Sequence, residues 1–598
     1  MIKLLKQSFT LLTKGQRKRF YTLQFLVVLM AFSEIIGVAS IIPFMSLVGD
    51  MGQLQRDTII AQVYKESGIN TETQFIFLLG VGVLFILFIS TIISMLTTWR
   101  LSMFGNKVGA EIADRLYAYY LKQGWLFHAS ESSAQLTKKV AIEAQRVTNG
   151  IIMPLMQMNS RIILALFIMF TIFFYDPKVA IIGLIFFATA YSILFKVVRM
   201  RLLHNGRAIS EVNEKRFRLM NEGFGGIKDV LLLGRANNFV KDFKQTGHLL
   251  AYSQGTNVAL SQVPSYLMQF LAFGSMIALL LYLIAGHDGN LGVILPIISV
   301  YALAGFKLLP AFQQIYASVA GIRGNIAAFQ SIQKELSEST RAKSLTLKPE
   351  RSYLHLKQQI SLENITFTYP GKVEPTLKQL NMSIPANSII GIVGPSGAGK
   401  STLIDILLGL IEPKQGHLKI DNIIINDKNR RSWQNTIGFV AQSIFLSEGT
   451  IAENVAFGIA QDQIDLDQVK KVLKLTYLTE LIQNLEQGIH TKVGERGVQL
   501  SGGQRQRIGI ARALYHQAEV LVFDEATSSL DGITEKIIME SINNFRGQKT
   551  IILIAHRIKT VQKCDQIFFI DKKKLVDQGT YKQLIKRNEH FRKIASHA

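Results

Sequence analysis

The chain has 598 residues, enough for about three or four ordinary domains, and 48% of them are hydrophobic. Its formal net charge is +23, which in a soluble protein would favour nucleic acid. Basic loops beside membrane spans account for this charge more simply, so we expect no nucleic-acid partner. The single cysteine, Cys564, excludes an intramolecular disulfide framework. No cleavable signal peptide is evident, because the first apolar run is too long for one.

Six charge-poor runs are each long enough to cross about 30 Å of hydrocarbon. They cover residues 21–48, 73–97, 149–175, 178–198, 259–286 and 291–318. Lys and Arg collect on the cytoplasmic side of membrane proteins. The first 20 residues carry six Lys/Arg, segment 98–148 carries seven and segment 199–258 carries ten. The links 175–178 and 287–290 carry one Lys between them. The pattern therefore predicts that both termini and the two long segments are cytoplasmic.

The two long cytoplasmic segments have helical patterning and few breakers. We expect the spans to continue into them as helices that turn and come back, with a short crosswise helix at each turn, at 124–128 and 225–230. These short helices would receive movement from the C-terminal half, and plain packing among cytoplasmic helices is the alternative. On the outer side, residues 55–64 fit either a short interfacial helix or a solvated loop.

Four ionisable residues lie within or at the end of the spans: Glu34, Arg100, Arg161 and Lys307. Because a charge isolated in lipid is costly, such residues indicate a function. Three cations facing one cavity would suit an anionic substrate. The alternatives are a structural ion pair for Glu34 and interfacial snorkelling for Arg100.

From about residue 319 the chain becomes polar and helical, with a break at Lys348-Pro349. We interpret 321–357 as a linker between a membrane domain at 1–320 and a mixed α/β domain at 358–598. The second domain opens with an alternating strand at 360–369.

A complete G-x-x-x-x-G-K-[ST] pattern organises this second domain. It consists of Gly394, Pro395, Ser396, Gly397, Ala398, Gly399, Lys400, Ser401 and Thr402. An apolar strand at 388–393 precedes it and an apolar helix at 402–408 follows it, as the pattern requires. Its backbone N–H groups would surround the phosphates of ATP. Lys400 would reach the β- and γ-phosphates, and Ser401 would bind Mg²⁺. A glycine-rich turn that binds nothing is the alternative.

Two acids end the predicted strand 520–525. Asp524 suits Mg²⁺ held through water, and Glu525 would polarise the attacking water. His556 follows the apolar strand 550–555 and could reach a γ-phosphate, although a lone His is more often structural. Gln442 is a similarly ambiguous polar residue in a loop.

A second small-residue loop lies at a predicted helix start and would form another anion site. It consists of Ser501, Gly502, Gly503 and Gln504. One domain with two phosphate-binding elements predicts a head-to-tail dimer. Each ATP would then lie between the 394–402 loop of one chain and the 501–504 loop of the other.

In this order, these motifs resemble the nucleotide-binding domain of ABC transporters over about 358–595. The resemblance implies that Tyr369 stacks on adenine and that Gln442 links Mg²⁺ to the membrane domain. It also implies that Ser529-Leu530-Asp531 is the D-loop and that Val493-Gly494-Glu495-Arg496-Gly497 contacts the crosswise helices. Every catalytic position matches the pattern of the family, which favours a homodimer with two competent ATP sites.

Six spans ahead of the ATPase resemble an exporter half-transporter, and three regions resemble the lipid-linked oligosaccharide flippases of the PglK group. These regions are residues 225–235, the early span with Glu34, and residues 305–310; the segment 49–72 falls where that group has an external helix. The group places basic residues in its cavity to attract a lipid pyrophosphate. Lys307 aligns with one of them, as Lys in place of Arg, which keeps the charge but loses the bidentate fork.

We therefore expect a six-span helical membrane domain fused to an α/β P-loop ATPase, homodimeric, in the inner membrane of a bacterium. The expected activity is ATP-driven flipping of a polyprenyl-pyrophosphate-linked oligosaccharide to the outer leaflet. Export of lipid A-like lipids or hydrophobic drugs, and export of peptides, are alternatives with the same fold. A soluble ABC ATPase in DNA repair or translation is an alternative from another class, against which the six spans argue.

Overall fold

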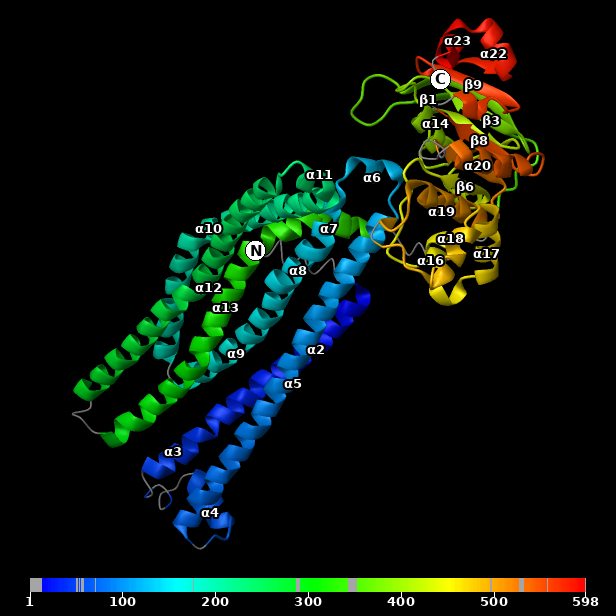
Figure 1. The fold of residues 1–598 in the computed structure, drawn as a ribbon. Coiled ribbons are helices and arrows are strands. Elements are labelled where there is room, and N and C mark those ends of the chain that lie inside the picture. The colour runs from blue at the N-terminus through cyan, green and yellow to red at the C-terminus, as the bar shows by residue number, and fades with distance from the viewer. Residues whose placement is uncertain are drawn as a thin grey trace. The chain divides into compact units, whose positions relative to one another are not determined.

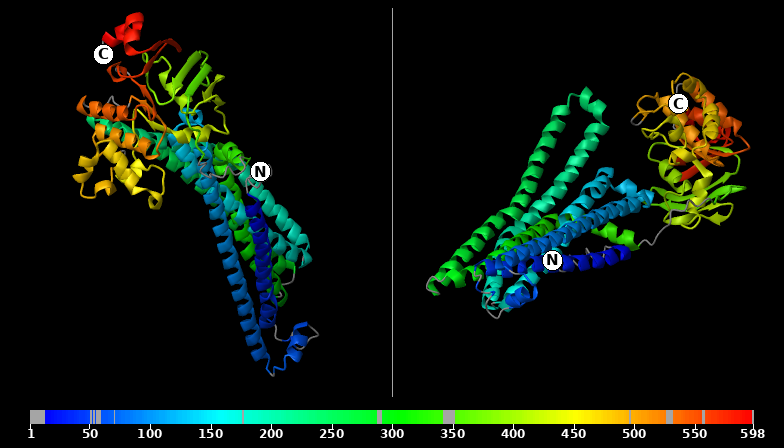
Figure 2. Two further views of the ribbon diagram at one scale, coloured as in Figure 1. Left: turned by 90° about the vertical axis from the view of Figure 1, so that its right-hand side faces the viewer. Right: turned by 90° about the horizontal axis from the view of Figure 1, so that it is seen from below.

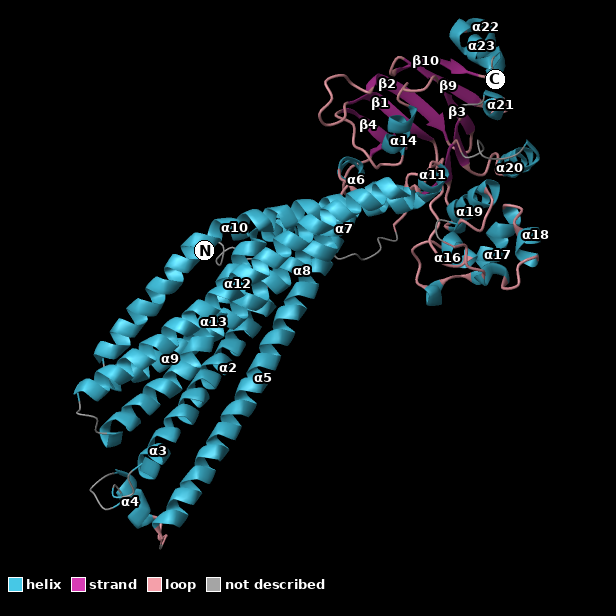
Figure 3. Cartoon of the chain, turned by 60° about the vertical axis from the view of Figure 1, so that its left-hand side comes forward, coloured by secondary structure: helices cyan, strands magenta, loops and turns pink. Residues whose placement is uncertain are grey.

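The computed structural model describes residues 13–49, 52, 54, 59–69, 71–175, 177–286, 291–341, 352–494, 497–525, 532–555 and 558–596. The chain divides into two compact units. The first comprises Met1–Gln123 and Phe127–Leu345, and the second comprises Gly124–Leu126 and Thr346–Ala598. Within the described residues, all strands belong to the second unit, and the first is helical (Figure 3). The predicted combination of a helical domain with an α/β domain is confirmed.

Long helices that run side by side build the first unit (Figure 1). They are α2 (Lys14–Ala39), α5 (Glu72–Leu121), α9 (Met153–Tyr175), α10 (Pro177–Gly225), α12 (Ala236–Gly286) and α13 (Leu291–Arg341). The four longest have 49 to 51 residues. At 1.5 Å per residue they extend about 75 Å, more than twice the hydrocarbon core. This confirms that the apolar spans continue as helices well beyond a bilayer.

Five helical segments of the described part are long and apolar enough to cross a membrane. They are Lys14–Gly37, Glu72–Leu121, Ser133–Phe174, Ala180–Gly225 and Ala236–Leu281. The sixth predicted span, 291–318, is helical as part of α13.

Shorter helices occupy the turns. They are α3 (Ile41–Gly49), α4 (Ile59–Glu66), α6 (Trp125–Ser130), α7 (Ser133–Lys138), α8 (Ala144–Val147) and α11 (Ile227–Leu232). Helices α6 and α11 match the predicted crosswise helices, and α4 matches the predicted outer helix from residue 59 onward. Residues 55–58 lie outside the described residues.

The predicted first span is broken at Ser40, between α2 and α3. Pro43 has no N–H to donate to the carbonyl of Ala39, so the helical ladder is interrupted there. The Ser40 hydroxyl donates to the Gly37 carbonyl at 2.8 Å, which supports the turn.

The predicted linker begins inside α13, because this helix continues to Arg341. Its last turns bury Ala328, Phe329, Ile332 and Leu336 in a core shared with α2 and α5. Apolar periodicity among polar residues therefore continues the core of the first unit along the described part of α13, past residue 320.

Helix α9 packs against both α2 and α13, and α2 lies beside α5 in both views of Figure 2. Two buried clusters hold these helices together. Leu23, Val27 and Leu116 belong to one cluster, and Ala31, Leu164 and Ala304 belong to the other. Polar residues on α9 can therefore reach side chains of both α2 and α13.

Two sheets form the second unit. The antiparallel sheet has the order β2-β1-β4-β5, with β1 (Gln359–Phe367), β2 (Leu377–Pro385), β4 (Gln415–Ile420) and β5 (Ile423–Ile424). The larger sheet has the order β10-β9-β3-β8-β7-β6, with β3 (Ile389–Val393), β6 (Ile437–Val440), β7 (Val520–Asp524), β8 (Thr550–Ile554), β9 (Gln566–Asp571) and β10 (Lys574–Gly579). All its pairings are parallel except β10 with β9.

Helices cover the larger sheet on both faces, which explains why β3 and β8 are buried along their whole length. The helices of this unit are α14 (Lys400–Leu407), α15 (Arg430–Thr436), α16 (Ile451–Val455), α17 (Leu466–Leu475), α18 (Thr479–Gln483), α19 (Gly502–Tyr515), α20 (Gly532–Asn544), α21 (Ile558–Val561), α22 (Tyr581–Arg587) and α23 (Glu589–Ser596). Because parallel strands end at one edge, the residues that follow β3, β6, β7 and β8 gather there.

Candidate functional site

The loop after β3 is shaped by glycines at two positions. A Cβ added at Gly394 would come within 2.0 Å of the Ile570 carbonyl oxygen. Gly399 has φ +102°, and a Cβ there would come within 2.9 Å of the Thr376 carbonyl oxygen. Side chains at these positions would therefore disrupt the loop. Helix α14 begins directly after Gly399, so its N-terminal N–H groups face the loop, as an anion-binding turn requires.

Lys400 is buried and folded back over this loop. Its Nζ donates to the Gly394 carbonyl at 2.7 Å and to the Pro395 carbonyl at 3.0 Å. Burial lowers the pKa of Lys400, and the charges of Glu525 and Asp524 act in the opposite direction. A cation held by neutral carbonyls beside two acids is arranged to transfer its hydrogen bonds to an incoming phosphate.

The two acids lie where β7 ends. Asp524 is the last residue of the strand, and Glu525 follows it in a left-handed conformation with φ 51°. A non-glycine residue in this conformation is strained, and such strain is common at active sites. Gln442, in the loop after β6, donates from Nε2 to Glu525 Oε2 at 2.8 Å. The structure thus brings together two residues that the sequence placed 83 positions apart.

Tyr369 lies beside the start of α14. Its hydroxyl is 3.2 Å from Thr402 Oγ1, and its ring contacts the Phe367 ring edge-to-face with centroids 5.0 Å apart. Lys372 Nζ is 5.8 Å from the ring centroid. The aromatic ring is therefore held next to the phosphate loop, where a base attached to the phosphates can reach it.

In the second anion loop, the polar groups of Ser501 and Gln504 form hydrogen bonds with each other. Ser501 caps α19, because its hydroxyl accepts from the Gln504 N–H at 3.2 Å while Gln504 Oε1 accepts from the Ser501 N–H at 2.7 Å. Gly502 and Gly503 form the first turn. Among the described residues, no hydrogen bond or ion pair is recorded between this loop and the 394–402 loop of the same chain.

Two predicted site residues, His556 and Asp531, lie outside the described residues, as do Glu495 and Arg496. The strand that precedes His556 is described, and Ala555 follows β8 at the same edge as Glu525.

Two polar residues near this edge were not predicted from the sequence. Asp405 is on α14, and burial raises its pKa to about 6. The negative charge of Asp524 also raises the pKa of Asp405, whereas a hydrogen bond from Trp125 lowers it. Arg512 on α19 donates to the Phe445 carbonyl at 3.0 Å and to the Asn454 carbonyl at 2.9 Å. It therefore ties the helix that begins at the second anion loop to the loop that carries Gln442.

In the first unit, Glu34 forms an ion pair. Lys307 Nζ on α13 is 3.3 Å from Glu34 Oε2 on α2, and their side chains are 35% and 10% exposed. Ser94 on α5 donates to Glu34 Oε1 at 2.9 Å. The structural ion pair considered for Glu34 is therefore present, and Lys307 is its partner. The charge of Lys307 is therefore compensated, and the arrangement of three cations facing one cavity stays a prediction.

The other two predicted cations are placed differently. Arg161 on α9 is half-buried, and no hydrogen bond or ion pair is recorded for it within the described part of the chain. Arg100 on α5 is exposed, and no recorded contact brings it to Glu34, Arg161 or Lys307. Within the described part of the chain, Arg161 is thus the half-buried cation of this group for which no carboxylate partner is found.

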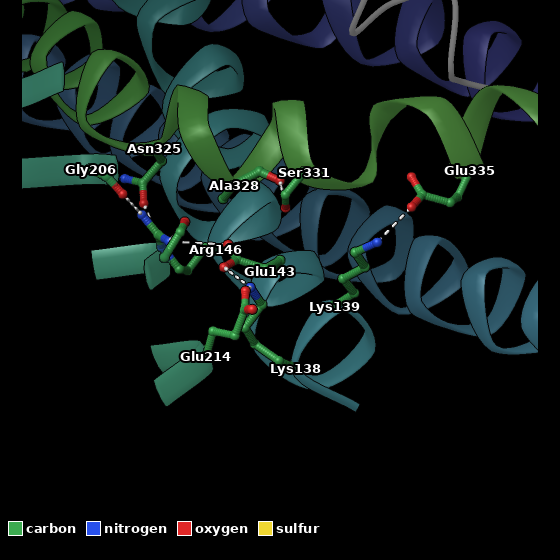
Figure 4. Close-up of polar contacts among 11 residues, drawn as sticks. Lys138, Lys139, Glu143, Arg146, Gly206, Glu214, Asn325, Ala328, Ser331 and Glu335 are labelled. Carbon is green, nitrogen blue, oxygen red and sulfur yellow. Dashed lines mark hydrogen bonds and ion pairs between the residues drawn. The ribbon is translucent and has the colours of Figure 1, made fainter. Parts of the chain in front are cut away.

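A buried ion network beyond the predicted spans was not foreseen (Figure 4). Glu143 is 0% exposed, and its Oε2 accepts from Arg146 at 3.0 Å. Lys138, 4% exposed, lies 3.9 Å from Glu143 Oε1 and 2.9 Å from Glu214 on α10. Arg146 also donates to Ser210 Oγ at 2.6 Å. The network joins the segment before α9 to α10.

Two π-helical turns flank Arg146 of this network. They are Lys139–Glu143 and Thr148–Ile152, on either side of α8. Arg146, between them, also contacts α13 through Asn325 Oδ1 at 3.3 Å (Figure 4). A π-turn carries one residue more than an α-turn and is frequently found at functional sites.

The arrangement at the sheet edge fits a nucleoside triphosphate and Mg²⁺. The loop is shaped to admit phosphate oxygens, and Ser401 and Asp524 offer the hard oxygen ligands that Mg²⁺ prefers. Among the described residues there is no group of three or more His, Cys, Asp or Glu that could hold a metal ion by itself. Mg²⁺ is usually bound by one or two protein oxygens together with phosphates, and Ser401 and Asp524 could supply such oxygens.

Comparison with known proteins covers both units. Residues 377–528 match the family described as ABC transporter, and residues 22–306 match the ABC transporter transmembrane region. ATP-dependent lipid A-core flippases are similar along most of their length. The protein of Pseudoalteromonas translucida is 26% identical over 560 residues, which cover 92% of this chain and 95% of that one. The protein of Escherichia coli K12 is 27% identical over 497 residues, which cover 83% and 84%.

A solved structure of a bacterial Atm1-family ABC exporter with ATP bound has the same fold. Its TM-score is 0.77 at 20% sequence identity, and the match covers 97% of this chain and 98% of that one. The order of the two matched regions, the P-loop site and the shared fold all indicate the same family. The chain belongs to the ABC transporters, as an exporter-type half-transporter and multi-pass membrane protein whose ATPase is coupled to transport.

Proposed function

We propose that this chain is a homodimeric, ATP-driven flippase of the bacterial inner membrane. Its substrate would be a polyprenyl-pyrophosphate-linked oligosaccharide, moved from the cytoplasmic to the outer leaflet. The observation that carries this substrate class is Arg161, a half-buried membrane cation for which no hydrogen bond or ion pair is found among the described residues, in the same helical unit as the Lys307–Glu34 pair. Together these three residues have a net charge of +1, so an anionic group is the favoured ligand.

The ATPase step follows from the residues at the sheet edge. Lys400 would exchange the carbonyls of Gly394 and Pro395 for the β- and γ-phosphates, and Tyr369 would stack on adenine. Mg²⁺, held by Ser401 and Asp524 with Gln442 nearby, would neutralise phosphate charge. Glu525 would orient and polarise the attacking water, and His556 would contact the γ-phosphate from the end of β8.

Completion of the site requires a second chain. The Ser501 loop is a helix N-terminus with exposed polar groups, and no recorded contact joins it to the phosphate loop of its own chain. In a head-to-tail homodimer it would cover the ATP bound to the partner, with Asp531 at the same junction. Mixing Lys400→Ala chains with Ser501→Arg chains tests this arrangement. In a mixed dimer both defects fall in one composite site and the other site is intact, so activity should reappear; inactive mixed dimers would contradict it.

The substrate assignment is tested with proteoliposomes that contain fluorescent polyprenyl-pyrophosphate oligosaccharide. We expect ATP-dependent movement, and we expect Arg161→Gln to slow it at least ten-fold with little change in basal ATP hydrolysis. Movement that is insensitive to Arg161→Gln would contradict the role of this cation.

A lipid A-core lipid is the second candidate, because the curated relatives are named as flippases of that lipid. Both candidates are glycolipids with phosphate groups, so they share the cationic requirement. The same proteoliposomes with a labelled lipid A-core lipid distinguish them: transport of this lipid alone would reject the polyprenyl assignment.

A further inference from the structure

Five amide side chains lie near one level on the membrane helices α2, α9 and α13. This amide layer consists of Gln24, Gln157, Asn159, Gln313 and Gln314. Gln314 Nε2 donates to Gln157 Oε1 at 2.9 Å, between α13 and α9. Asn159 Nδ2 donates to Gln24 Oε1, between α9 and α2. Since Gln157 and Asn159 are two residues apart on α9, the two pairs differ in height by about 3 Å.

Two N–H donors of the amide layer have no hydrogen-bond partner within the layer. Nε2 of Gln24 and Nε2 of Gln313 are buried, and neither has a hydrogen-bond partner among the described residues. An unsatisfied N–H in an apolar span is costly. Amides that serve only to hold membrane helices together form hydrogen bonds across the interface. The two unpaired donors are therefore available to an acceptor that the described helices do not supply.

The cations lie deeper in the membrane than most of the amides. Arg161 follows Gln157 by one turn on the same face of α9, and Lys307 precedes Gln314 by two turns on α13. At 1.5 Å per residue, Arg161 lies about 6 Å beyond Gln157 along α9, and Lys307 lies about 10 Å beyond Gln314 along α13, both toward the bilayer centre.

This order matches a glycolipid of the cytoplasmic leaflet. Its chains occupy the bilayer centre, its phosphate follows, and its sugars project toward the cytoplasm. A sugar hydroxyl both donates and accepts, as an amide does, whereas a phosphate favours cations. The deeper Arg161 suits the phosphate, and the shallower amides suit the sugars.

We propose that the amide layer is a glycan subsite that selects the sugar part of the substrate, while Arg161 binds its pyrophosphate. This inference rests on the proposed function, since it assigns residues to the head group of that substrate. A site built to hydrogen-bond a hydroxyl discriminates strongly against a ligand that lacks it, because its polar groups then stay unpaired. The amide layer would thus distinguish a finished glycan from a bare carrier lipid.

The test compares two probes in proteoliposomes of the full-length dimer: polyprenyl pyrophosphate that carries an oligosaccharide, and polyprenyl pyrophosphate without sugar. The readout is the ratio of their ATP-dependent transport rates. We expect the Gln157→Leu/Gln314→Leu double variant to lower this ratio at least ten-fold. Asn205 and Asn257 form an amide pair between α10 and α12, with Nδ2 3.0 Å from Oδ1. Their double Leu variant is the matched control and should keep the wild-type ratio.

A single variant separates recognition from helix packing. Gln313→Leu removes an unpaired donor without breaking a recorded pair, so it should not lower the melting temperature of the substrate-free protein. It should nevertheless lower the ratio, and it decides the question if the double variant fails to fold. A wild-type ratio in Gln313→Leu and in a folded double variant would overturn the glycan subsite. Wild-type protein that transports neither probe would instead reject the proposed function itself.

Discussion

Gln442 Nε2 donates a 2.8 Å hydrogen bond to Glu525 Oε2, so the loop after β6 and the end of β7 are connected by their side chains. Glu525 also has φ 51°, and its backbone N–H donates to the Ile554 carbonyl at 3.1 Å. The proposed base is therefore fixed by its own backbone and by a neighbouring amide. Its carboxylate can be oriented before any water arrives.

Replacement of Glu525 by Gln removes the group that polarises water but leaves the phosphate loop intact. We expect ATP hydrolysis to fall at least about 100-fold, in line with the usual contribution of a positioned base, while ATP binding persists. Steady-state phosphate release and nucleotide binding, measured on the same preparation, check this. Glu374→Gln is the control, because Glu374 is exposed and pairs with Lys573. Hydrolysis at the wild-type rate in Glu525→Gln would remove Glu525 from the mechanism.

The Glu34–Lys307 pair should show strong coupling in stability. Glu34→Gln leaves a cation without its partner in a membrane segment, and Lys307→Gln leaves an anion, so each should lower the melting temperature. The double variant should recover most of the loss, with a coupling of about 0.5–3 kcal/mol for contacting residues. Thermal unfolding of the four proteins in detergent measures it. The exposed pair Glu589–Lys593 should show almost none, and additive losses at Glu34 and Lys307 would refute their pairing.

Glu143 should be the most sensitive position of the buried ion network. Glu143→Ala leaves Lys138 and Arg146 buried without their shared anion, and breaking such a pair costs about 3–5 kcal/mol. We expect a clear fall in melting temperature. A triple variant with Met at 138, Leu at 143 and Met at 146 should recover stability, because hydrophobic replacement of buried ion pairs is often neutral or favourable. A Glu143→Ala protein as stable as wild type would show that the network carries little stability.

Replacement of Asp405 should change the melting temperature in a way that depends on pH. Its pKa is raised to about 6 in the folded protein from an ordinary 3.8, so the folded state binds more protons between these values. Ionisation of Asp405 therefore destabilises the fold progressively as pH rises from about 4 to about 6, and fully above that. Asp405→Asn should raise the melting temperature at pH 8 and have little effect near pH 4. Asp427→Asn, at an exposed position, is the control; equal gains at both pH values would exclude this cause.

The nucleotide site was largely predictable because most of its residues belong to short motifs that are continuous in the sequence. A run of glycines, one lysine and a flanking strand define the phosphate loop, and a strand ending in acids defines Asp524 and Glu525. Parallel pairing of β6 with β7 could not be read from the sequence. The contact between Gln442 and Glu525 depends on that pairing, and it emerged only in the structure.

The membrane charges were found but not their partners. Hydropathy shows that Glu34, Arg161 and Lys307 lie in spans, yet it gives no rotation of one helix against another. Glu34 and Lys307 are 273 residues apart, and only the packing of α2 and α13 brings them together. Glu143 and Arg146 gave no signal, because their charges look like those of an ordinary solvated helix until α10 and α13 cover them.

The two π-turns before α9 also set the angular phase of that helix. Each inserts one residue relative to an α-helical ladder, which is about 100° of rotation. Two insertions turn everything after Ile152 by about 200° relative to the segment before Lys139. A helical wheel drawn straight through 133–175 would therefore assign Arg161 to nearly the opposite side. The direction in which the membrane cation points is determined by two surplus residues, one just before the predicted span and one at its start, and a single deletion there would turn it toward another neighbour.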